Sequence, residues 1–82
     1  MRCEIAFHQQ DVGNARVGNH SFKTTVTFNY ENYDETHWAP EREKEIVQGI
    51  LGTSWMWYTA TLAPLNVNER RWEVSHGYDS GD

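Results

Sequence analysis

The sequence contains a single cysteine, Cys3, and no run of apolar residues near its N-terminus. One cysteine excludes a disulfide within the chain, and both features predict a protein of a reducing, cytoplasmic compartment that is not secreted. No segment approaches the roughly 18 apolar residues that a membrane-spanning helix requires. We therefore expect no membrane partner.

Basic residues are scarce, with seven Lys and Arg against 12 Asp and Glu and a net charge of -5. Direct binding to nucleic acid or anionic lipid needs clustered Lys and Arg, so this balance argues against both. Trp55 and Trp57 could stack on single-stranded nucleic acid, but a stacking platform also needs a cationic groove. Lys23, Arg2 and Arg71 supply too little positive charge for one.

Motifs for metal, cofactor or phosphate binding are missing. The four histidines have no zinc-motif spacing and one cysteine cannot complete a Cys/His site, so we expect no metal and no cofactor. Gly13 and Gly18 match neither a P-loop nor a dinucleotide-binding motif. His37, near Asp34 and Glu35, is the one place where a general base could be proposed. We expect a protein that is not an enzyme, with a small enzyme built on His37 as an alternative.

Alternating apolar and polar residues predict strands at residues 2–8 and 21–30, joined by a polar loop at 9–20. In the first strand Cys3, Ile5 and Phe7 would face the core. Residues 40–51 are expected to form a helix, because Pro40 suits the first helical position and Gly52 would end it. The apolar stripe of this helix consists of Ile46, Val47, Ile50 and Leu51. That stripe predicts one buried side, which must lie across a sheet.

The stretch 54–62 is rich in large side chains on both faces of a predicted strand. We place Met56, Tyr58, Ala60 and Leu62 under the helix, because Thr59 and Thr61 then match the threonine-rich polar face of strand 21–30. Trp55 and Trp57 then lie on the open face, unless the sheet twist, the first loop or the tail shields them. A last strand at 69–76 would bury Trp72 and Val74.

The predicted order is β-β-α-β-β, an α+β fold with a four-stranded, largely antiparallel sheet and one helix on one face. Residues 1–76 would form a single domain and residues 77–82 a flexible tail.

Negative charge is concentrated in residues 31–45, with six acids against Arg42 and Lys44. Such a segment is often only a solvated helix surface, but it can also dock on a basic site with aromatic anchors. We expect contact with a larger, basic protein. The residues expected to make it are Glu31, Tyr33, Asp34, Glu35, Trp38, Glu41 and Glu45, with Trp55 and Trp57 from the strand.

The leading hypothesis is a small acidic inhibitor or modulator that occupies a basic, nucleic-acid-binding type of site on a larger protein. In size, acidity and aromatic content the chain is similar to small inhibitors made by bacterial viruses, such as anti-CRISPR or nucleic-acid-mimic proteins. That similarity is one of composition, and no motif carries it. The alternative is an oligomerising module in which Trp55 and Trp57 bury an aromatic sheet face in a homodimer.

Overall fold

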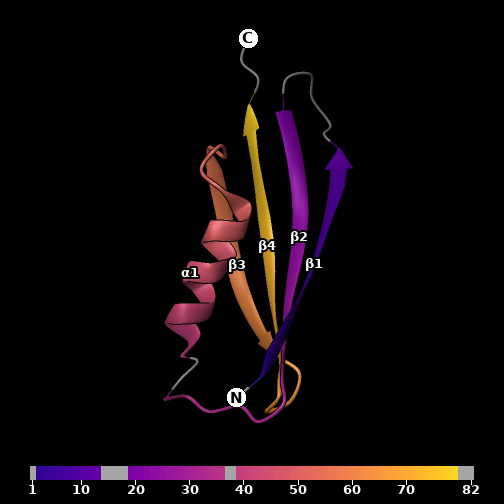
Figure 1. The fold of residues 1–82 in the computed structure, drawn as a ribbon. Coiled ribbons are helices and arrows are strands. Elements are labelled where there is room, and N and C mark those ends of the chain that lie inside the picture. The colour runs from indigo at the N-terminus through magenta and orange to yellow at the C-terminus, as the bar shows by residue number, and fades with distance from the viewer. Residues whose placement is uncertain (1, 14–18, 37–38, 80–82) are drawn as a thin grey trace.

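The structure, a computed structural model, describes residues 2–13, 19–36 and 39–79. Within these residues the chain forms four strands and one helix in the order β-β-α-β-β, which confirms the predicted α+β architecture (Figure 1). The elements are β1 (Cys3–Gly13), β2 (Asn19–Tyr30), α1 (Pro40–Leu51), β3 (Trp57–Pro64) and β4 (Glu69–Asp79).

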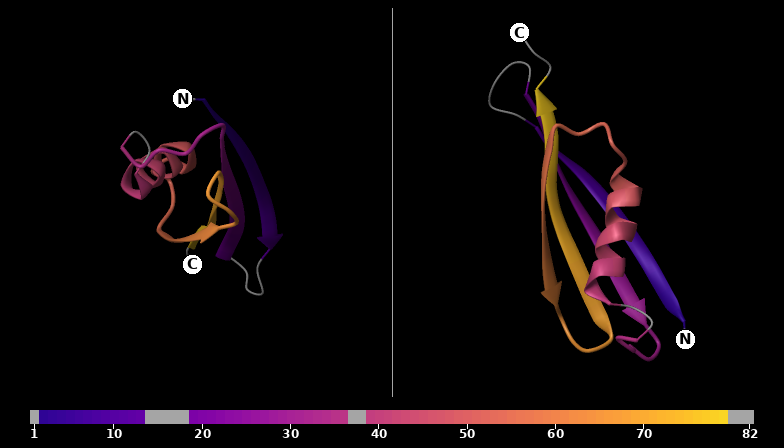
Figure 2. Two further views of the ribbon diagram at one scale, coloured as in Figure 1. Left: turned by 90° about the horizontal axis from the view of Figure 1, so that it is seen from below. Right: turned by 90° about the vertical axis from the view of Figure 1, so that its left-hand side faces the viewer.

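The strands form one sheet in the order β1-β2-β4-β3, and every pairing is antiparallel. The connection through α1 carries the chain from β2 to the far edge of the sheet, and β4 then returns between β2 and β3. Figure 1 and the left-hand view of Figure 2 place α1 toward the β3 edge and leave β1 on the opposite edge. The β3 edge of the sheet therefore lies near the helix, whereas the β1 edge lies away from it.

Strands β1 and β4 are longer than their sequence pattern predicts. β1 continues beyond residue 8 because the polar residues Gln9 and Asp11 find partners on β2, opposite Thr24 and Phe22. β4 continues past residue 76 because residues 77–79 pair with residues 19–21 of β2. Backbone pairing needs no apolar side chain, so polar segments beside a long neighbouring strand are drawn into the sheet. Residues 14–18 of the expected loop and 80–82 of the expected tail lie outside the described part.

Helix α1 has the predicted bounds and one buried side. Pro40 starts the helix, and Gly52 ends it with φ 82° while its N–H donates to the carbonyl of Gln48. Val47 and Leu51 are buried, as the apolar stripe predicts, but Ile50 is 38% exposed. The buried side is thus rotated away from Ile50.

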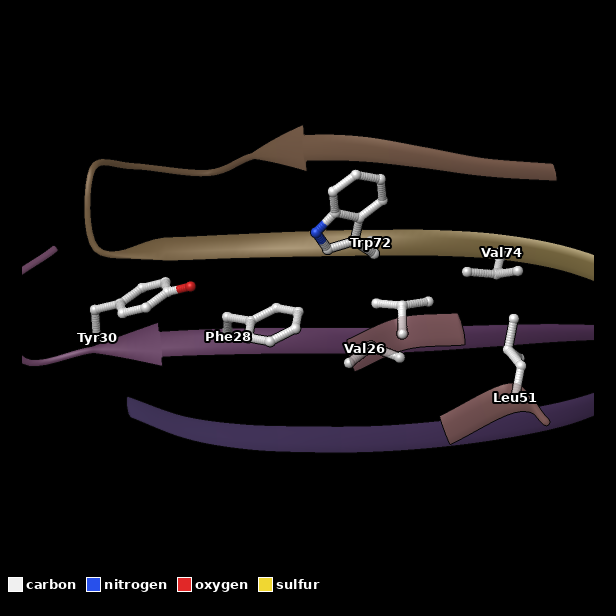
Figure 3. Close-up of a cluster of buried hydrophobic side chains, with 7 residues drawn as sticks. Val26, Phe28, Tyr30, Leu51, Trp72 and Val74 are labelled. Carbon is white, nitrogen blue, oxygen red and sulfur yellow. The ribbon is translucent and has the colours of Figure 1, made fainter. Parts of the chain in front are cut away.

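The hydrophobic core lies between this buried side and the two central strands. It consists of Val26, Phe28 and Tyr30 on β2, Trp72 and Val74 on β4, and Val47 and Leu51 on α1 (Figure 3). A helix of 12 residues is about 18 Å long, whereas a 12-residue strand spans about 40 Å. One helix therefore cannot cover the whole length of the sheet face.

Strand β3 begins later than predicted, which changes the position of one tryptophan. Tyr58, Ala60 and Leu62 do lie on the helix face, opposite the buried His76, Val74 and Trp72 of β4. Met56 and Trp55 precede the strand. Strand alternation therefore does not govern these two residues, and their predicted faces are wrong. Met56 is 68% exposed, and Trp55 packs against the core from the helix side.

Candidate interaction surfaces

The acidic residues of the 31–45 segment lie mainly at the lower end of the molecule in Figure 1, where β2 ends and α1 begins. Glu31, Glu35, Glu41 and Glu45 are exposed there and along the first turns of α1. Asp34 is half-buried and shapes the connection, because its Oδ1 accepts hydrogen bonds from the N–H (2.9 Å) and Oγ1 (2.7 Å) of Thr36. Four of the predicted carboxylates are thus available to a partner.

Glu43, one of the six acids of this segment, does not belong to the acidic surface. Its side chain is fully buried, and its carboxylate accepts hydrogen bonds from the hydroxyl of Tyr30 and from Nε1 of Trp72, at 3.0 Å. Nε of Arg70 donates to both carboxylate oxygens, at 3.1 and 2.9 Å. Arg70 therefore neutralises the Glu43 charge inside the protein.

The position of Glu43 follows from helix geometry. Residues four apart lie on the same side of a helix, and Glu43 precedes the buried Val47 and Leu51 by four and eight residues. This spacing was available in the sequence as a signal that one acid of the segment points inward. The identity of its partners, Arg70 and Trp72 from β4, depends on the strand order and could not be read from local spacing.

The Glu43 cluster fits a structural role. Burial and the hydrogen bond to Glu43 raise the pKa of Tyr30 far above its ordinary value, so the hydroxyl stays a neutral donor. Nε1 of Trp72 and Nε of Arg70 donate to the same carboxylate. The cluster therefore fixes α1 on the sheet. The Glu43 carboxylate within it is not exposed to solvent.

Tyr33 belongs partly to the same cluster. Its ring meets that of Tyr30 edge-on at 4.8 Å, and the guanidinium carbon of Arg70 lies 4.8 Å from its ring centre. Its backbone N–H donates to Oδ1 of Asn68 at 3.0 Å. Burial raises the pKa of the Tyr33 hydroxyl. Tyr33 is thus held by the fold, and only part of its ring is accessible.

The two predicted tryptophans that the structure describes, Trp55 and Trp57, lie away from the acidic end. Trp57 opens β3 at the upper end of the sheet in Figure 1 and is 41% exposed on the face opposite α1, as predicted. Its indole lies over Gly77, where an added Cβ would come within 2.8 Å of its Cζ2 atom. Trp38 and His37 lie outside the described residues, so the general base proposed at His37 stays a prediction.

Trp55 closes the upper end of the helix face, beyond the last turn of α1. Its Nε1 donates to the carbonyl of Leu51 at 2.7 Å, and its ring lies 4.3 Å from that of His76 and 5.2 Å from that of Phe22. Nε2 of His76 pairs with Oγ1 of Thr24 at 2.6 Å, and both residues are fully buried. Trp55 thus covers a part of the sheet face that the helix does not reach, and its contact with a partner stays a prediction.

A shallow hollow of about 300 Å³ lies beside Trp55, between the end of α1 and β3. Its walls come from Gln48, Leu51, Gly52, Thr53, Trp55 and Tyr58. None of these six side chains is charged, and Gln48 donates a hydrogen bond to the Tyr58 hydroxyl across it. The hollow offers no acid, base or nucleophile arrangement of a catalytic site.

The edge strand β1 exposes apolar side chains that the sequence pattern placed in the core. Ile5 and Phe7 lie on the helix face, opposite the fully buried Phe28 and Val26 of β2, but are 42% and 49% exposed. Cys3 is half-buried, and burial raises the pKa of its thiol, which keeps it protonated and unreactive. For Ile5 and Phe7 the predicted face is confirmed, but the predicted burial is wrong because α1 does not cover them, whereas Cys3 packs against the core as predicted.

Among the described residues, no three His, Cys, Asp or Glu side chains come together in a way that could hold a metal ion. In the same part of the chain, no helix combines the length and the apolar character needed to cross a membrane. Comparisons of the chain with protein-family models, curated proteins and solved structures give no match.

Proposed function

We propose that the protein is a non-enzymatic binding protein that docks its acidic lower end on a basic site of a larger protein. The observation behind this proposal is the group of exposed carboxylates that surrounds the start of α1: Glu31, Glu35, Glu41 and Glu45. Arg42 and Lys44 are exposed on the same helix but are outnumbered. Clustered carboxylates of this kind steer a protein toward Lys and Arg clusters and raise its rate of association.

The chemistry of the partner follows from the charge of this end. A site lined by Lys and Arg commonly holds phosphate groups, so a carboxylate surface competes with nucleic acid for it. The protein would then act as an inhibitor by occupying the site. Its contact with the partner depends on charge more than on aromatic anchors, because Tyr33 packs on Tyr30 and Arg70, and Trp57 lies near the other end of the sheet.

The experiment compares two variants with the same net charge. Glu35→Gln with Glu41→Gln removes two negative charges from the acidic end, whereas Thr59→Lys with Thr61→Lys adds two positive charges on exposed positions of β3. Each variant and the parent protein are immobilised and exposed to a lysate of the organism that encodes the chain. Bound proteins are then quantified by mass spectrometry over a series of salt concentrations.

We expect a basic protein that the parent and the Thr59/Thr61 variant retain equally, that salt releases, and that the Glu35/Glu41 variant retains several-fold less. Equal retention by the Glu35/Glu41 variant would overturn the proposal. Equal losses in both variants, or no salt-sensitive basic protein on the parent, would overturn it as well. Asp34 is left unchanged because its hydrogen bonds to Thr36 hold the backbone of the connection.

A further inference from the structure

Among the residues that the structure describes, strand β1 forms an open edge of the sheet, because its only neighbour in the strand order is β2. β1 is 11 residues long. Its pairing with β2 is regular up to Asp11, and the register shifts only between Asp11 and Gly13. Residues 3–10 contain no proline and no lysine, the residues that commonly prevent edge strands from pairing with other chains. The other edge, β3, is shorter and ends at Pro64. β1 is thus the less protected edge.

The direction of the free backbone groups of β1 follows from one hydrogen bond. The carbonyl of Arg2 accepts from the N–H of Glu31, at 2.9 Å, so this pair is hydrogen-bonded across the β1–β2 ladder. Hydrogen-bonded and non-bonded pairs alternate in an antiparallel ladder. The N–H and C=O groups of Glu4, Ala6 and His8 are therefore directed at β2, while those of residues 3, 5, 7 and 9 face away from the sheet.

The side chains of the same odd-numbered residues include the exposed apolar pair. Ile5 and Phe7 continue the row of core residues Phe28 and Val26 sideways, to where α1 no longer covers the sheet. A strand added at this edge would satisfy the free backbone groups and would also cover Ile5 and Phe7. A single added strand would therefore both pair with the open edge and cover the exposed apolar pair.

We propose that this occupant is β1 of a second copy of the chain, paired antiparallel about a two-fold axis at Ala6. In this register Ile5 of each copy lies opposite Phe7 of the other, as a hydrogen-bonded pair with both side chains on the helix face. Ala6 lies opposite Ala6 at the axis. The two apolar pairs would cover each other across the new interface.

Charge complementarity selects this register. With the axis at Ala6, Glu4 of one copy lies opposite His8 of the other on the polar face, where an imidazole N–H donates to the carboxylate. An axis at Ile5 would place Glu4 opposite Ala6. An axis at Phe7 would place it opposite Gln10. Each alternative loses both copies of the Glu4–His8 pair and separates Ile5 from Phe7.

The dimer would be a continuous sheet of eight strands, two sets of the four in each chain, with both helices on the same face. This interface is separate from the acidic end proposed to bind a basic partner, and either one can exist without the other. It also differs from a dimer through Trp55 and Trp57, since Trp55 is engaged within the fold.

A disulfide reports the register directly. Ala6→Cys is made together with Cys3→Ser, so that the new thiol is the only one in each chain. At the axis the two Ala6 residues form a non-hydrogen-bonded pair with Cα atoms about 4.5 Å apart, within the range of about 4.4–6.8 Å that a disulfide accepts. Gln10→Cys with Cys3→Ser is the matched control, because Gln10 is exposed and leaves the Glu4–His8 pair intact, and the two Gln10 residues would lie eight residues apart along the strand, about 26 Å.

Under mild oxidation at low protein concentration, we expect the Ala6→Cys protein to form a covalent dimer at least about tenfold faster than the Gln10→Cys protein, since only its thiols meet the geometric requirement. Non-reducing electrophoresis against time measures the two rates. Equal rates, or a faster reaction of the Gln10→Cys protein, would overturn the register.

Sedimentation equilibrium tests the dimer without cysteines. We expect the parent protein to associate as its concentration rises toward about 1 mM, a range that detects dissociation constants of about 1 mM or tighter. Ile5→Lys should weaken association at least about tenfold by placing a charge in the apolar strip. Val67→Lys, at a position that is 70% exposed and outside β1, should leave it unchanged. A parent protein that stays monomeric throughout, or equal effects of the two substitutions, would overturn the dimer.

Discussion

The carboxylate of Glu43 on α1 is held by Nε of Arg70 on β4, which lies 2.9 Å from Oε2. The Glu43 side chain is fully buried and that of Arg70 is 12% exposed, so this ion pair joins the helix to the sheet almost out of contact with water. The hydrogen bonds from Tyr30 and Trp72 compensate part of the cost of removing the charge from water.

Truncation of Glu43 should strongly destabilise the fold. Glu43→Ala leaves the Arg70 guanidinium without its carboxylate and the indole N–H of Trp72 without its acceptor, and breaking a buried pair in this way costs about 3–5 kcal/mol. Glu41→Ala, at an exposed position of the same helix, should change stability by less than about 0.5 kcal/mol. Urea unfolding monitored by circular dichroism measures both, and similar costs would contradict the role given to Glu43.

The Glu43 cluster also marks where sequence reasoning succeeds and where it fails. The period of α1 and its Pro40 and Gly52 boundaries are local signals, and the helix forms with the predicted bounds. The partners Arg70 and Trp72 lie 27 and 29 residues away, on a strand whose place between β2 and β3 no local pattern specifies. Helix periodicity therefore locates the buried side of α1 and directs Glu43 toward it, but it does not identify the partners of this carboxylate.

The same limit explains the errors at the ends of the strands. Trp55 was placed by extending strand alternation over two residues that precede β3, and its true position depends on the hydrogen bond to Leu51 and the contact with His76. Ile5 and Phe7 were placed on the correct face, but their exposure depends on how far α1 reaches across the sheet. The local sequence pattern predicts which face of the sheet a side chain lies on. Whether that side chain is buried depends on elements that are distant in the sequence.

Acid should destabilise the protein through His76. Burial lowers the pKa of this imidazole below the value of about 6.5 expected in the unfolded chain, so the unfolded state binds the proton more readily. The contribution of neutral His76 to stability is present above about pH 6.5 and is lost as the pH falls below it. The free energy of unfolding should therefore decrease between about pH 7.5 and pH 5.5, a change that urea unfolding at several pH values can measure.

The slope of the free energy of unfolding against pH, compared between variants, tests whether His76 causes this decrease. His76→Gln retains a hydrogen-bonding side chain beside Thr24 but cannot titrate, so its stability should depend less on pH even if it is lower throughout. His8→Gln, at an exposed position of β1, should retain the slope of the parent protein. An unchanged slope in His76→Gln would show that another group causes the acid sensitivity.

The two tryptophans at the start of β3 should differ in their effect on stability. Trp55→Ala removes the ring that covers His76 and Phe22 together with the hydrogen bond to Leu51, and should cost about 3 kcal/mol. Trp57→Ala removes a ring that is 41% exposed on the opposite face and should cost at least about 1 kcal/mol less. Urea unfolding of both variants checks the order, and an equal or larger loss in Trp57→Ala would contradict the inward placement of Trp55.

The glycines near the end of α1 should respond to alanine with opposite signs. Gly49 lies in the exposed interior of the helix, where an added Cβ meets nothing within 4 Å, so Gly49→Ala should stabilise the protein by about 0.5–1 kcal/mol through its better helix propensity. Gly52 has φ 82° and ψ -167°, a conformation that residues with a Cβ rarely adopt, so Gly52→Ala should cost about 1–3 kcal/mol although the space around it is also open. Thermal unfolding of both variants and of the parent distinguishes backbone conformation from steric contact as the cause. A gain of similar size at both positions would mean that the helix does not end at Gly52 in solution.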